Sequence, residues 1–428
     1  MSFFAVPLSG LNASQSALQS ISSNLSNTNT DGYKDQNVTF SDLFAQGGAT
    51  NGALDPLQVG QGVSTASTTS NFTDGPTTAT NISSNMALAG NGFFVLQQTG
   101  GGVAYSRAGD FTTSNAGQLV APDGSLVLGY PAQNGVVQTA SALQPLNVGT
   151  GLTSPATATT KFNADINLDA NTAVGATASP ASTIQTFDSL GALQVLTISY
   201  TRTSTGWNYN VTVPTSSLAP PATPPSTPPG PTTTVTSGTL TFDTSGNLTS
   251  PVTAGGKPGS ISIAVPPLAD GSAPLNVSWN LADASGKSTI TQTNLASATS
   301  NQVSDGSRAG TLKNYSVQAD GTVQGLFSNG GTIALGQVAV ATVENTQGLQ
   351  QIGNNLFQVT AGSGQAQVGI AGTGGRATIV GGSVEGSNVN VASEFSKMIV
   401  AQQAYQANAK VVSTLNQVSQ ATLAMIQG

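Results

Sequence analysis

Residues 4–27 read FAVPLSGLNASQSALQSISSNLSN, and no charged side chain occurs between residues 1 and 30. The large apolar residues of this stretch recur every seven positions, which is the spacing of a helical seam. They are Phe4, Leu11, Leu18 and Leu25, with Leu8 and Ile21 beside them. Pro7 is tolerated in a first turn, and the polar run after the last leucine favours termination. We predict a helix over about residues 7–27.

The C-terminal end repeats this pattern over a longer stretch. Asn388 or Asn390 is suited to cap a helix that starts near residue 391, and a helix from there to residue 427 would be about 55 Å long. Its charged side chains are only Glu394, Lys397 and Lys410. Its seven-residue register and the flanking apolar positions are Val391, Met398, Tyr405, Val412 and Ile426, with Phe395, Leu415 and Leu423.

The remaining faces of both predicted helices carry Ser, Asn, Gln and Ala. A helix packed on a globular core is the ordinary explanation of an apolar stripe, but such a helix usually has a charged outer face. We therefore predict that the apolar residues named above pack between subunits. Because isolated helices of this kind are marginal in water, we also expect both ends to become ordered only on assembly.

The composition favours a protein that associates with itself. Charged residues make up 7% of the chain and the net charge is -7, without clustered Lys or Arg, so nucleic acid and anionic membranes are unfavourable partners. With no cysteine and no histidine, disulfides, thiolate metal sites and the commonest general base are excluded. No apolar run reaches the length of a membrane helix, and the uncharged start does not match a cleavable signal.

Between the ends, residues 33–387 are rich in β-branched residues and glycine turns, which predicts a β region without helices. Alternating apolar and polar runs at residues 192–200 and 207–213 indicate strands. Eight of the 21 prolines lie in residues 214–231, which predicts an exposed loop rather than a central strand. An ordinary surface loop is favoured over a proline-recognition motif, which would need an aromatic-lined partner.

The motifs that often carry chemistry are incomplete here. Residues 286–288 (GKS) end like a phosphate-binding loop, but Leu281 stands where that loop needs glycine. Residues 163–169 alternate Asn and Asp as calcium ligands do, without the Gly and Glu of an EF-hand loop. The glycine-rich runs 90–92 and 372–375 do not join a strand to a helix. Any two of the 18 acids could meet as a carboxylate pair, and none is singled out. We predict no catalytic, metal or cofactor site, and not an enzyme.

Three separated sets of segments resemble the flagellar rod and hook protein family. They are SSNLSNTNTDGYK (22–34); NGFFVL (91–96), YSRAGDF (105–111), GQLV (117–120) and LGY (128–130); and EGSNV (385–389), EF (394–395), MI (398–399) and QAYQANAK (403–410). They occur in the family's order. Gln403 stands where the family usually has Arg, and MALA (86–89) replaces an acidic start of a strand, so family ion pairs are not expected at these points.

The middle of the chain resembles the hook branch of this family. The matching segments are YSVQADGTV (315–323), LGQV (335–338), NTQGL (345–349) and GNNLF (353–357). The resemblance implies a structural subunit of the flagellar hook, which polymerises into a flexible tubular universal joint that transmits torque from rod to filament. A distal rod subunit is the alternative, but it would lack most of residues 147–287. An unrelated secreted β-rich enzyme or adhesin would not explain the terminal stripes.

The resemblance also implies nested domains. They are a terminal helical domain (1–30 and 388–428) that forms an inner tube as a coiled coil, connecting segments (31–71 and 373–387), a first β domain (72–146 and 288–372) and an outer β domain (147–287) with the proline-rich loop 214–231. The implied partners are further copies of the chain, the distal rod, hook cap and hook-filament junction proteins, and the type III export apparatus. The protein would then lie outside the cell, in the hook and basal body. A chain without cysteine suits export in an unfolded form, because no disulfide can lock it.

Overall fold

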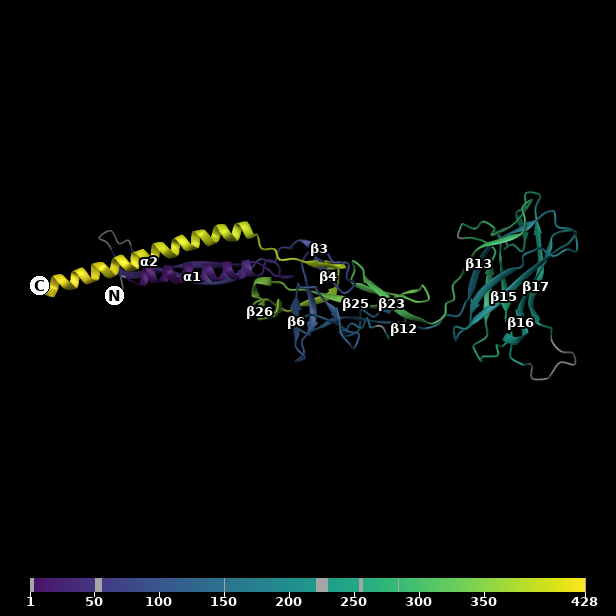
Figure 1. Ribbon diagram of the computed structural model, residues 1–428, viewed down its shortest axis with the longest axis horizontal. Helices are drawn as coiled ribbons and strands as arrows, with labels where there is room; N and C mark the ends of the chain where they lie inside the picture. The colour runs from purple at the N-terminus through teal and green to yellow at the C-terminus, as the bar shows by residue number, and fades with distance from the viewer. Residues whose placement is uncertain are drawn as a thin grey trace. The chain divides into compact units, whose positions relative to one another are not determined.

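The computed structural model describes residues 4–50, 56–149, 151–220, 230–253, 257–283 and 285–427, without the side chains of 44–50, 56–59, 426 and 427. The chain is mainly β with one helix at each end, which confirms the predicted fold class (Figure 1). It divides into two compact units. Unit 1 comprises Met1–Thr150, Asn314–Gly325 and Thr332–Gly428, and unit 2 comprises Gly151–Lys313 and Leu326–Gly331.

The terminal helices belong to unit 1 and are α1 (Ala5–Ser26) and α2 (Val391–Gln427). The cap of α2 is Asn390, whose side-chain oxygen accepts a hydrogen bond from the Ser393 amide at 3.1 Å. Both helices are formed and in contact within the single chain, although the sequence led us to expect order only on assembly. The reason is that each helix has a partner inside the chain, including a hairpin that the sequence analysis did not assign.

That hairpin consists of the antiparallel strands β1 (Gln36–Thr50) and β2 (Pro56–Ser70), which run beside α1 (Figure 1). Two serines of the helix hold it. Ser20 Oγ donates to the Gln36 carbonyl at 2.8 Å, and Ser9 Oγ accepts from the Val63 amide at 3.1 Å. A two-stranded sheet is marginal by itself, so α1 and the hairpin stabilise each other.

The β region of unit 1 is built around β5, whose residues Phe93 to Leu96 are buried on both faces. Phe94 and Leu96 belong to one apolar core, while Phe93 and Val95 belong to another on the opposite face. The neighbouring strands follow the order β25-β9-β5-β6-β27-β26, with β7, β8, β10, β11 and β28 at their sides. Their bounds are β5 (Phe93–Gln97), β6 (Val103–Ser106), β7 (Thr112–Thr113), β8 (Leu119–Val120), β9 (Leu126–Gln133), β10 (Val136–Val137), β11 (Gln144–Pro145), β25 (Thr332–Thr342), β26 (Gln350–Gly353), β27 (Leu356–Gln358) and β28 (Gln367–Ile370).

Two short antiparallel pairs complete unit 1 close to the helices. They are β4 (Met86–Ala89) with β29 (Thr378–Gly381), and β3 (Thr77–Ala79) with β30 (Ser383–Glu385). A 3-10 turn, η2 (Thr346–Gly348), precedes β26. Because each pair joins an early strand to a late one, the two ends of the chain are held together at this level.

Unit 2 contains two five-stranded sheets whose inner faces share one apolar core. The first sheet has β13 (Lys161–Asp169), β19 (Ser260–Ala264), β20 (Asn276–Asn280), β21 (Ile290–Thr293) and β22 (Ala298–Ser304), and the second has β14 (Ser182–Phe187), β15 (Leu193–Arg202), β16 (Trp207–Pro214), β17 (Thr232–Phe242) and β18 (Leu248–Ser250). Trp279 stacks on Phe162 at 6.0 Å and meets Tyr209 edge-on at 5.7 Å between ring centroids, which fills this core. The remaining strands are β12 (Thr153–Ser154), β23 (Gly310–Val317) and β24 (Thr322–Phe327).

Several predicted features of unit 2 are present, and one boundary differs. Burial alternates along β15 and β16 as the sequence pattern indicates. The Asn and Asp residues of 163–169 lie on the less buried side of β13. The GKS segment lies in a turn closed by Asp283. The proline-rich stretch follows β16 and includes η1 (Thr215–Ser217), with residues 221–229 outside the described part. Since β21 and β22 pair with β13, unit 2 extends to residue 313 rather than ending at 287.

Candidate functional site

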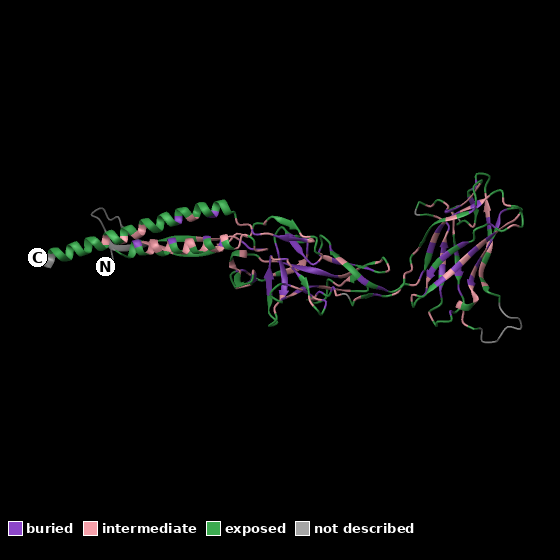
Figure 2. Ribbon diagram, viewed as in Figure 1, coloured by how far each residue is buried: buried purple, intermediate pink, exposed green. Residues whose placement is uncertain are grey.

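Many of the exposed large apolar side chains among the described residues lie on the helix pair. Figure 2 shows α2 exposed along nearly its whole length, whereas the buried residues gather in the strands of the two units. Among its described side chains only Glu394 and Ala401 are buried. Met425 is 84% exposed and Val400 is 66% exposed, values that a stable surface helix in water does not favour. The pair is therefore the place where a partner would gain most by covering the chain.

The structure distributes the predicted packing residues over three levels of exposure. Ile21 is buried; Leu11, Leu18, Leu25, Met398, Val412 and Leu415 are half-buried; Phe4, Leu8, Val391, Phe395, Tyr405 and Leu423 are exposed; and the side chain of Ile426 lies outside the described residues. Most of these apolar side chains thus remain at least partly open to solvent in one chain. Their packing between subunits stays a prediction.

The contact between the two helices uses small and polar residues rather than the leucines. A methyl group on Gly10 would lie 2.7 Å from the side-chain Nδ2 of Asn408, so the Asn408 side chain lies directly against α1 there. Asn24 meets Glu394 with a 3.1 Å hydrogen bond. Gly10 and Asn24 are two heptads apart in α1, and so are Asn408 and Glu394 in α2. The helices therefore run antiparallel in one continuous register over this length.

The leucine stripe of α1 lies to one side of this contact. Leu11, Leu18 and Leu25 each follow one residue after Gly10, Ala17 and Asn24, which rotates them by about 100° around the helix. This explains why the leucines are half-buried, while Ser14 is buried. The sequence signal for the contact with α2 is the seven-residue repeat of small or polar side chains at Gly10, Ala17 and Asn24. A pattern of large apolar residues does not reveal this repeat.

Asn24 is the centre of a polar network at the base of the helix pair. Its Nδ2 donates to Asp35 Oδ1 at 2.6 Å, to the Gln36 carbonyl at 2.9 Å and to Glu394 Oε2. Its Oδ1 accepts from Tyr33 Oη at 3.1 Å and from the Gln36 amide at 3.0 Å. Asn24 is only 1% exposed, and its bonds to Glu394 and Tyr33 are fully buried, whereas those to Asp35 and Gln36 are partly buried. The network therefore fixes the end of α1, the start of the hairpin and the start of α2 relative to one another.

A buried ion cluster lies next to this network along the chain. Glu385, which is fully buried, accepts from Lys34 Nζ at 2.6 Å and from Arg107 Nε at 3.0 Å. Arg107 also donates to Asp74 at 2.5 Å and to the carbonyls of Gly90 and Gly92. Lys34, Arg107 and Glu385 are buried, and Asp74, whose side chain is 45% exposed, balances the charge from the surface. Pairing of this kind is the condition under which buried charges are tolerated.

The electrostatic environment of these groups follows from their burial. Burial lowers the pKa of Lys34, and the nearby Arg107 charge adds to this effect while Glu385 opposes it. Burial raises the pKa of Asp35; Lys397 acts against this shift and Glu394 adds to it. Burial likewise raises the pKa of Tyr33. The cluster and the network hold the chain in place and present no open site for a reacting group.

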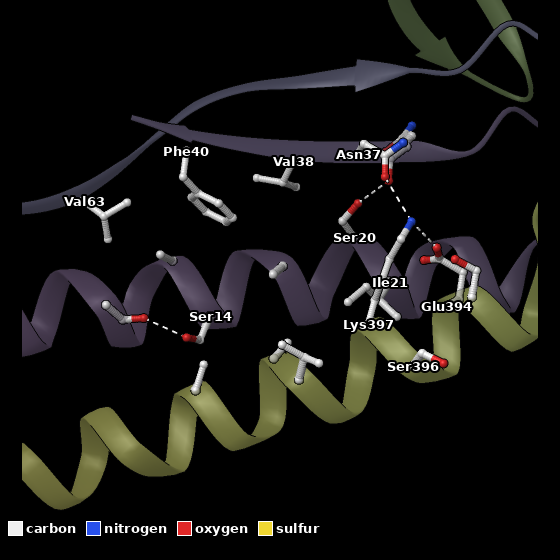
Figure 3. A pocket seen from close by; sticks show the side chains of 18 of the residues that line it. Ser14, Ser20, Ile21, Asn37, Val38, Phe40, Val63, Glu394, Ser396 and Lys397 are labelled. Carbon is white, nitrogen blue, oxygen red and sulfur yellow. Dashed lines mark hydrogen bonds and ion pairs between the residues drawn. The ribbon is translucent and has the colours of Figure 1, made fainter. Parts of the chain in front are cut away.

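A groove with a volume of about 710 Å³ lies between α1, α2 and the hairpin. Figure 3 shows Ile21, Val38, Phe40 and Val63 along it, and Lys397 with Glu394 at one end. Lys397 Nζ binds Glu394 at 2.5 Å and Asn37 Oδ1 at 3.1 Å. The lining is mostly small and apolar, so the groove suits packing rather than chemistry.

In the part of the chain that the structure describes, no group of three or more acidic residues is arranged to hold a metal ion. Within the same residues, neither helix has the length and hydrophobicity needed to cross a bilayer.

Sequence reasoning missed the ion cluster and the polar network. Lys34 and Glu385 are 351 residues apart, and no local pattern connects them. The signal that could have found them is scarcity: in a chain with 7% charged residues, Lys34, Arg107 and Glu385 all fall within the quoted family segments. A charged residue in a chain with so few charges suggests a specific ion-pair partner within the fold.

Family models match four stretches of the chain. They are "Flagella basal body rod protein" (residues 5–34), "Flagellar hook protein FlgE/F/G D1 domain" (87–184), "Flagellar basal body protein FlaE D2 domain" (153–307) and "Flagellar basal body rod FlgEFG protein C-terminal" (380–425). The terminal models are shared with rod proteins, whereas the model for residues 153–307 covers most of unit 2.

Whole relatives are similar over nearly the full chain. The flagellar hook protein FlgE of Escherichia coli (strain K12) is 32% identical over 430 residues, which covers 97% of this chain and 98% of that protein. The flagellar hook protein FlgE of Treponema pallidum (strain Nichols) is 30% identical over 455 residues, covering 95% and 96%. The crystal structure of Helicobacter pylori flagellar hook protein FlgE2 covers 71% of this chain and 98% of that chain with a TM-score of 0.47 and 14% identity, a likeness too low to carry an argument.

Proposed function

The chain belongs to the flagellar hook protein family, and from this premise we propose that it polymerises into a flexible tube that acts as a universal joint between rod and filament. The observation that supports polymerisation most directly is the helix pair, whose apolar side chains stay exposed in the single chain. Covering them with further copies would remove this exposure. The role is mechanical and needs no catalytic group, metal or cofactor.

The same premise favours the hook over the distal rod. Residues 5–34 and 380–425 match models named for rod proteins, so the ends do not discriminate between the two. Residues 153–307 fold as most of a separate unit, and hook relatives align across it. A distal rod subunit would lack most of this region.

We assign the domains of the assembly as follows. Residues 1–30 and 388–428 form the inner tube, 31–71 and 373–387 are connecting segments, 72–146 and 288–372 form the first β domain, and 147–287 form the outer β domain. The uncharged helices support this placement, because a tube wall of many copies gives each helix neighbours on several sides. The hairpin within 31–71 would then brace the wall from the side of α1.

The low charge offers a physical basis for bending. Interfaces made of Ser, Thr, Asn and Gly exchange their contacts with water at little cost, whereas fixed ion pairs would resist sliding. Complementary charges introduced on the β-domain faces should therefore stiffen the polymer. Bending stiffness measured from the curvature of single tubes tests this, and unchanged stiffness would count against it.

The remaining partners follow from the same premise. They are the distal rod protein at one end, the hook cap and hook-filament junction proteins at the other, and the flagellar type III export apparatus. The protein would reach the outside of the cell unfolded through that apparatus. The absence of cysteine supports this route, because no disulfide can hold the chain in a wide conformation.

Electron microscopy of the purified full-length chain tests the proposal. Curved tubes support the hook assignment, straight rigid rods support the distal rod, and persistent monomers contradict both. A variant without residues 1–27 should fail to polymerise while circular dichroism shows that the β units remain folded. Polymerisation of that variant would overturn the role given to the helices.

A further inference from the structure

Among the described residues, the C-terminal end of α2 extends past the first residue of α1. The register set by Gly10 with Asn408 and by Asn24 with Glu394 places Ala5, the first residue of α1, opposite about residue 413. Because α2 continues to Gln427, its stretch from about residue 414 onward passes beyond the start of α1. We call this stretch the α2 overhang.

The overhang carries no charged residue; Leu415 is half-buried, and three further apolar side chains are open to solvent. Val418 is 57% exposed, Leu423 is 56% exposed and Met425 is 84% exposed. The line that contacts α1 in the same chain, through Glu394, Ala401 and Asn408, continues without interruption at Leu415 and Thr422. The overhang therefore continues the line of an existing helix–helix interface past the first described residues of α1.

A complementary surface exists on α1. The leucine stripe, Leu11, Leu18 and Leu25, lies beside the internal contact and is half-buried. It too has no charged neighbour on the helix, since α1 contains no charged residue. An uncharged apolar segment meets this stripe without leaving a charge desolvated and unpaired.

We propose that the α2 overhang of one copy docks on the leucine stripe of α1 in a second copy. The inference rests on the proposed polymerisation and specifies its contact. The two surfaces are different, so the contact is heterologous: each copy offers an overhang to one neighbour and a stripe to another. A heterologous contact that does not close into a ring generates an open helical filament. Because this contact joins an overhang to a stripe, it gives the filament a direction of growth.

The absence of cysteine in the chain makes the test direct. Copies with Leu18→Cys are mixed with copies with Leu415→Cys, polymerised, and treated with a short bis-maleimide. Each copy has one cysteine, so any crosslinked peptide found by mass spectrometry joins two chains. Within one chain the register places Leu18 near residue 400, which is about 22 Å along α2 from Leu415. The expected result is a mixed peptide, in which the thiol introduced at position 18 is linked to the thiol introduced at position 415.

Matched controls use the opposite faces of the same helices. Gln417 is exposed on the far side of the overhang, and Asn12 is exposed away from the leucine stripe. Mixtures that pair Leu18→Cys with Gln417→Cys, or Asn12→Cys with Leu415→Cys, should give no mixed peptide in the same tubes. Leu11→Cys replaces Leu18→Cys as a second reporter of the stripe.

Each outcome decides the question. Tubes in which position 18 is linked only to position 18, and position 415 only to position 415, overturn the docking and leave the proposed function standing. Equal mixed crosslinks in the controls have the same meaning. Wild-type chains that form no tubes contradict the proposed function itself. If copies with Leu18→Cys and Leu11→Cys are both excluded from wild-type tubes while Asn12→Cys copies enter them, the stripe is part of the contact and the proposal is supported.

Discussion

Asn24 and Glu394 are joined by a 3.1 Å hydrogen bond across 370 residues of sequence. This bond lies where α1 ends and α2 begins, and both side chains are buried. A buried polar pair of this kind fixes the register of two helices better than apolar contacts, which tolerate sliding.

Replacing Asn24 with Ala should loosen this register. The change removes the Asn24 hydrogen bonds to the Gln36 amide and to Glu394 Oε2, which costs about 2–3 kcal/mol, while Glu394 keeps its ion pair with Lys397. Native-state hydrogen exchange should show faster opening of the last turns of α1. The exposed Asn12→Ala is the matched control, since it removes an asparagine from the same helix without touching the network. Equal protection in the two variants would refute the role of Asn24.

Glu385→Gln should destabilise unit 1 by about 3–5 kcal/mol, because Lys34 and Arg107 would keep their buried charges without the matching carboxylate. Chemical denaturation followed by the fluorescence of an introduced unit 1 reporter measures the change. Glu344→Gln is the control, since Glu344 is exposed and forms no ion pair among the described residues; it should change stability by no more than about 0.5 kcal/mol. Similar effects of both changes would contradict the cluster's importance.

Gly32→Ala tests the turn that brings Lys34 to Glu385. Gly32 has a φ of +69° and donates to the Glu385 carbonyl at 2.7 Å. A Cβ there would lie 2.3 Å from the backbone nitrogen of Ala108. The left-handed conformation alone costs a non-glycine residue about 1–2 kcal/mol, and the backbone clash adds to it. Gly100→Ala, where a Cβ meets nothing within 4 Å, should leave the melting temperature unchanged. A Gly32→Ala variant with an unchanged melting temperature would show that the turn can rearrange.

Asp305→Asn should reveal a pH-dependent contribution in unit 2. Burial would raise the pKa of Asp305, but hydrogen bonds from Thr160 and Lys161 outweigh it and lower the pKa below its usual 3.8. The carboxylate therefore stabilises the fold fully above pH 3.8, and the effect is lost as the pH falls through the lower folded value. Since Asp305 is exposed, we expect only about 1 kcal/mol at neutral pH. Urea denaturation of both proteins across pH 2–7 checks this; a stability difference that persists at pH 2 would argue against it.

The sequence was sufficient for the elements that depend on local pattern. The run NGFFVL, quoted above only for its family resemblance, contains β5, a strand buried on both faces because its continuous apolar residues fill two cores at once. The bounds of α2 agree with its polar cap and heptad. The alternation of apolar and polar residues correctly predicts β15 and β16.

What the sequence did not provide depends on contacts between distant segments. Most residues of the hairpin β1–β2 are Ser, Thr, Gln, Gly or Asn, so the hairpin lacks the regular alternation that would reveal strands. The sequence pattern assigns the packing of α1 to its leucines, although Gly10 and Asn24 are the residues that contact α2. The Lys34–Glu385 pair depends on how two chain ends return to one place, which no local rule specifies.

The position of Glu385 has a consequence for the order in which the protein folds. Lys34 and Arg107 lie in the first quarter of the chain, while their shared carboxylate comes near its end. Likewise β5 lies between β6 and β9 but also pairs with β25, more than 200 residues later. Such non-local closure is slow, because the long loop must be ordered before its contacts form. Unit 1 therefore cannot complete its core or neutralise its buried charges until almost the whole polypeptide is present. A chain whose C-terminal part is not yet available remains incompletely folded in this unit.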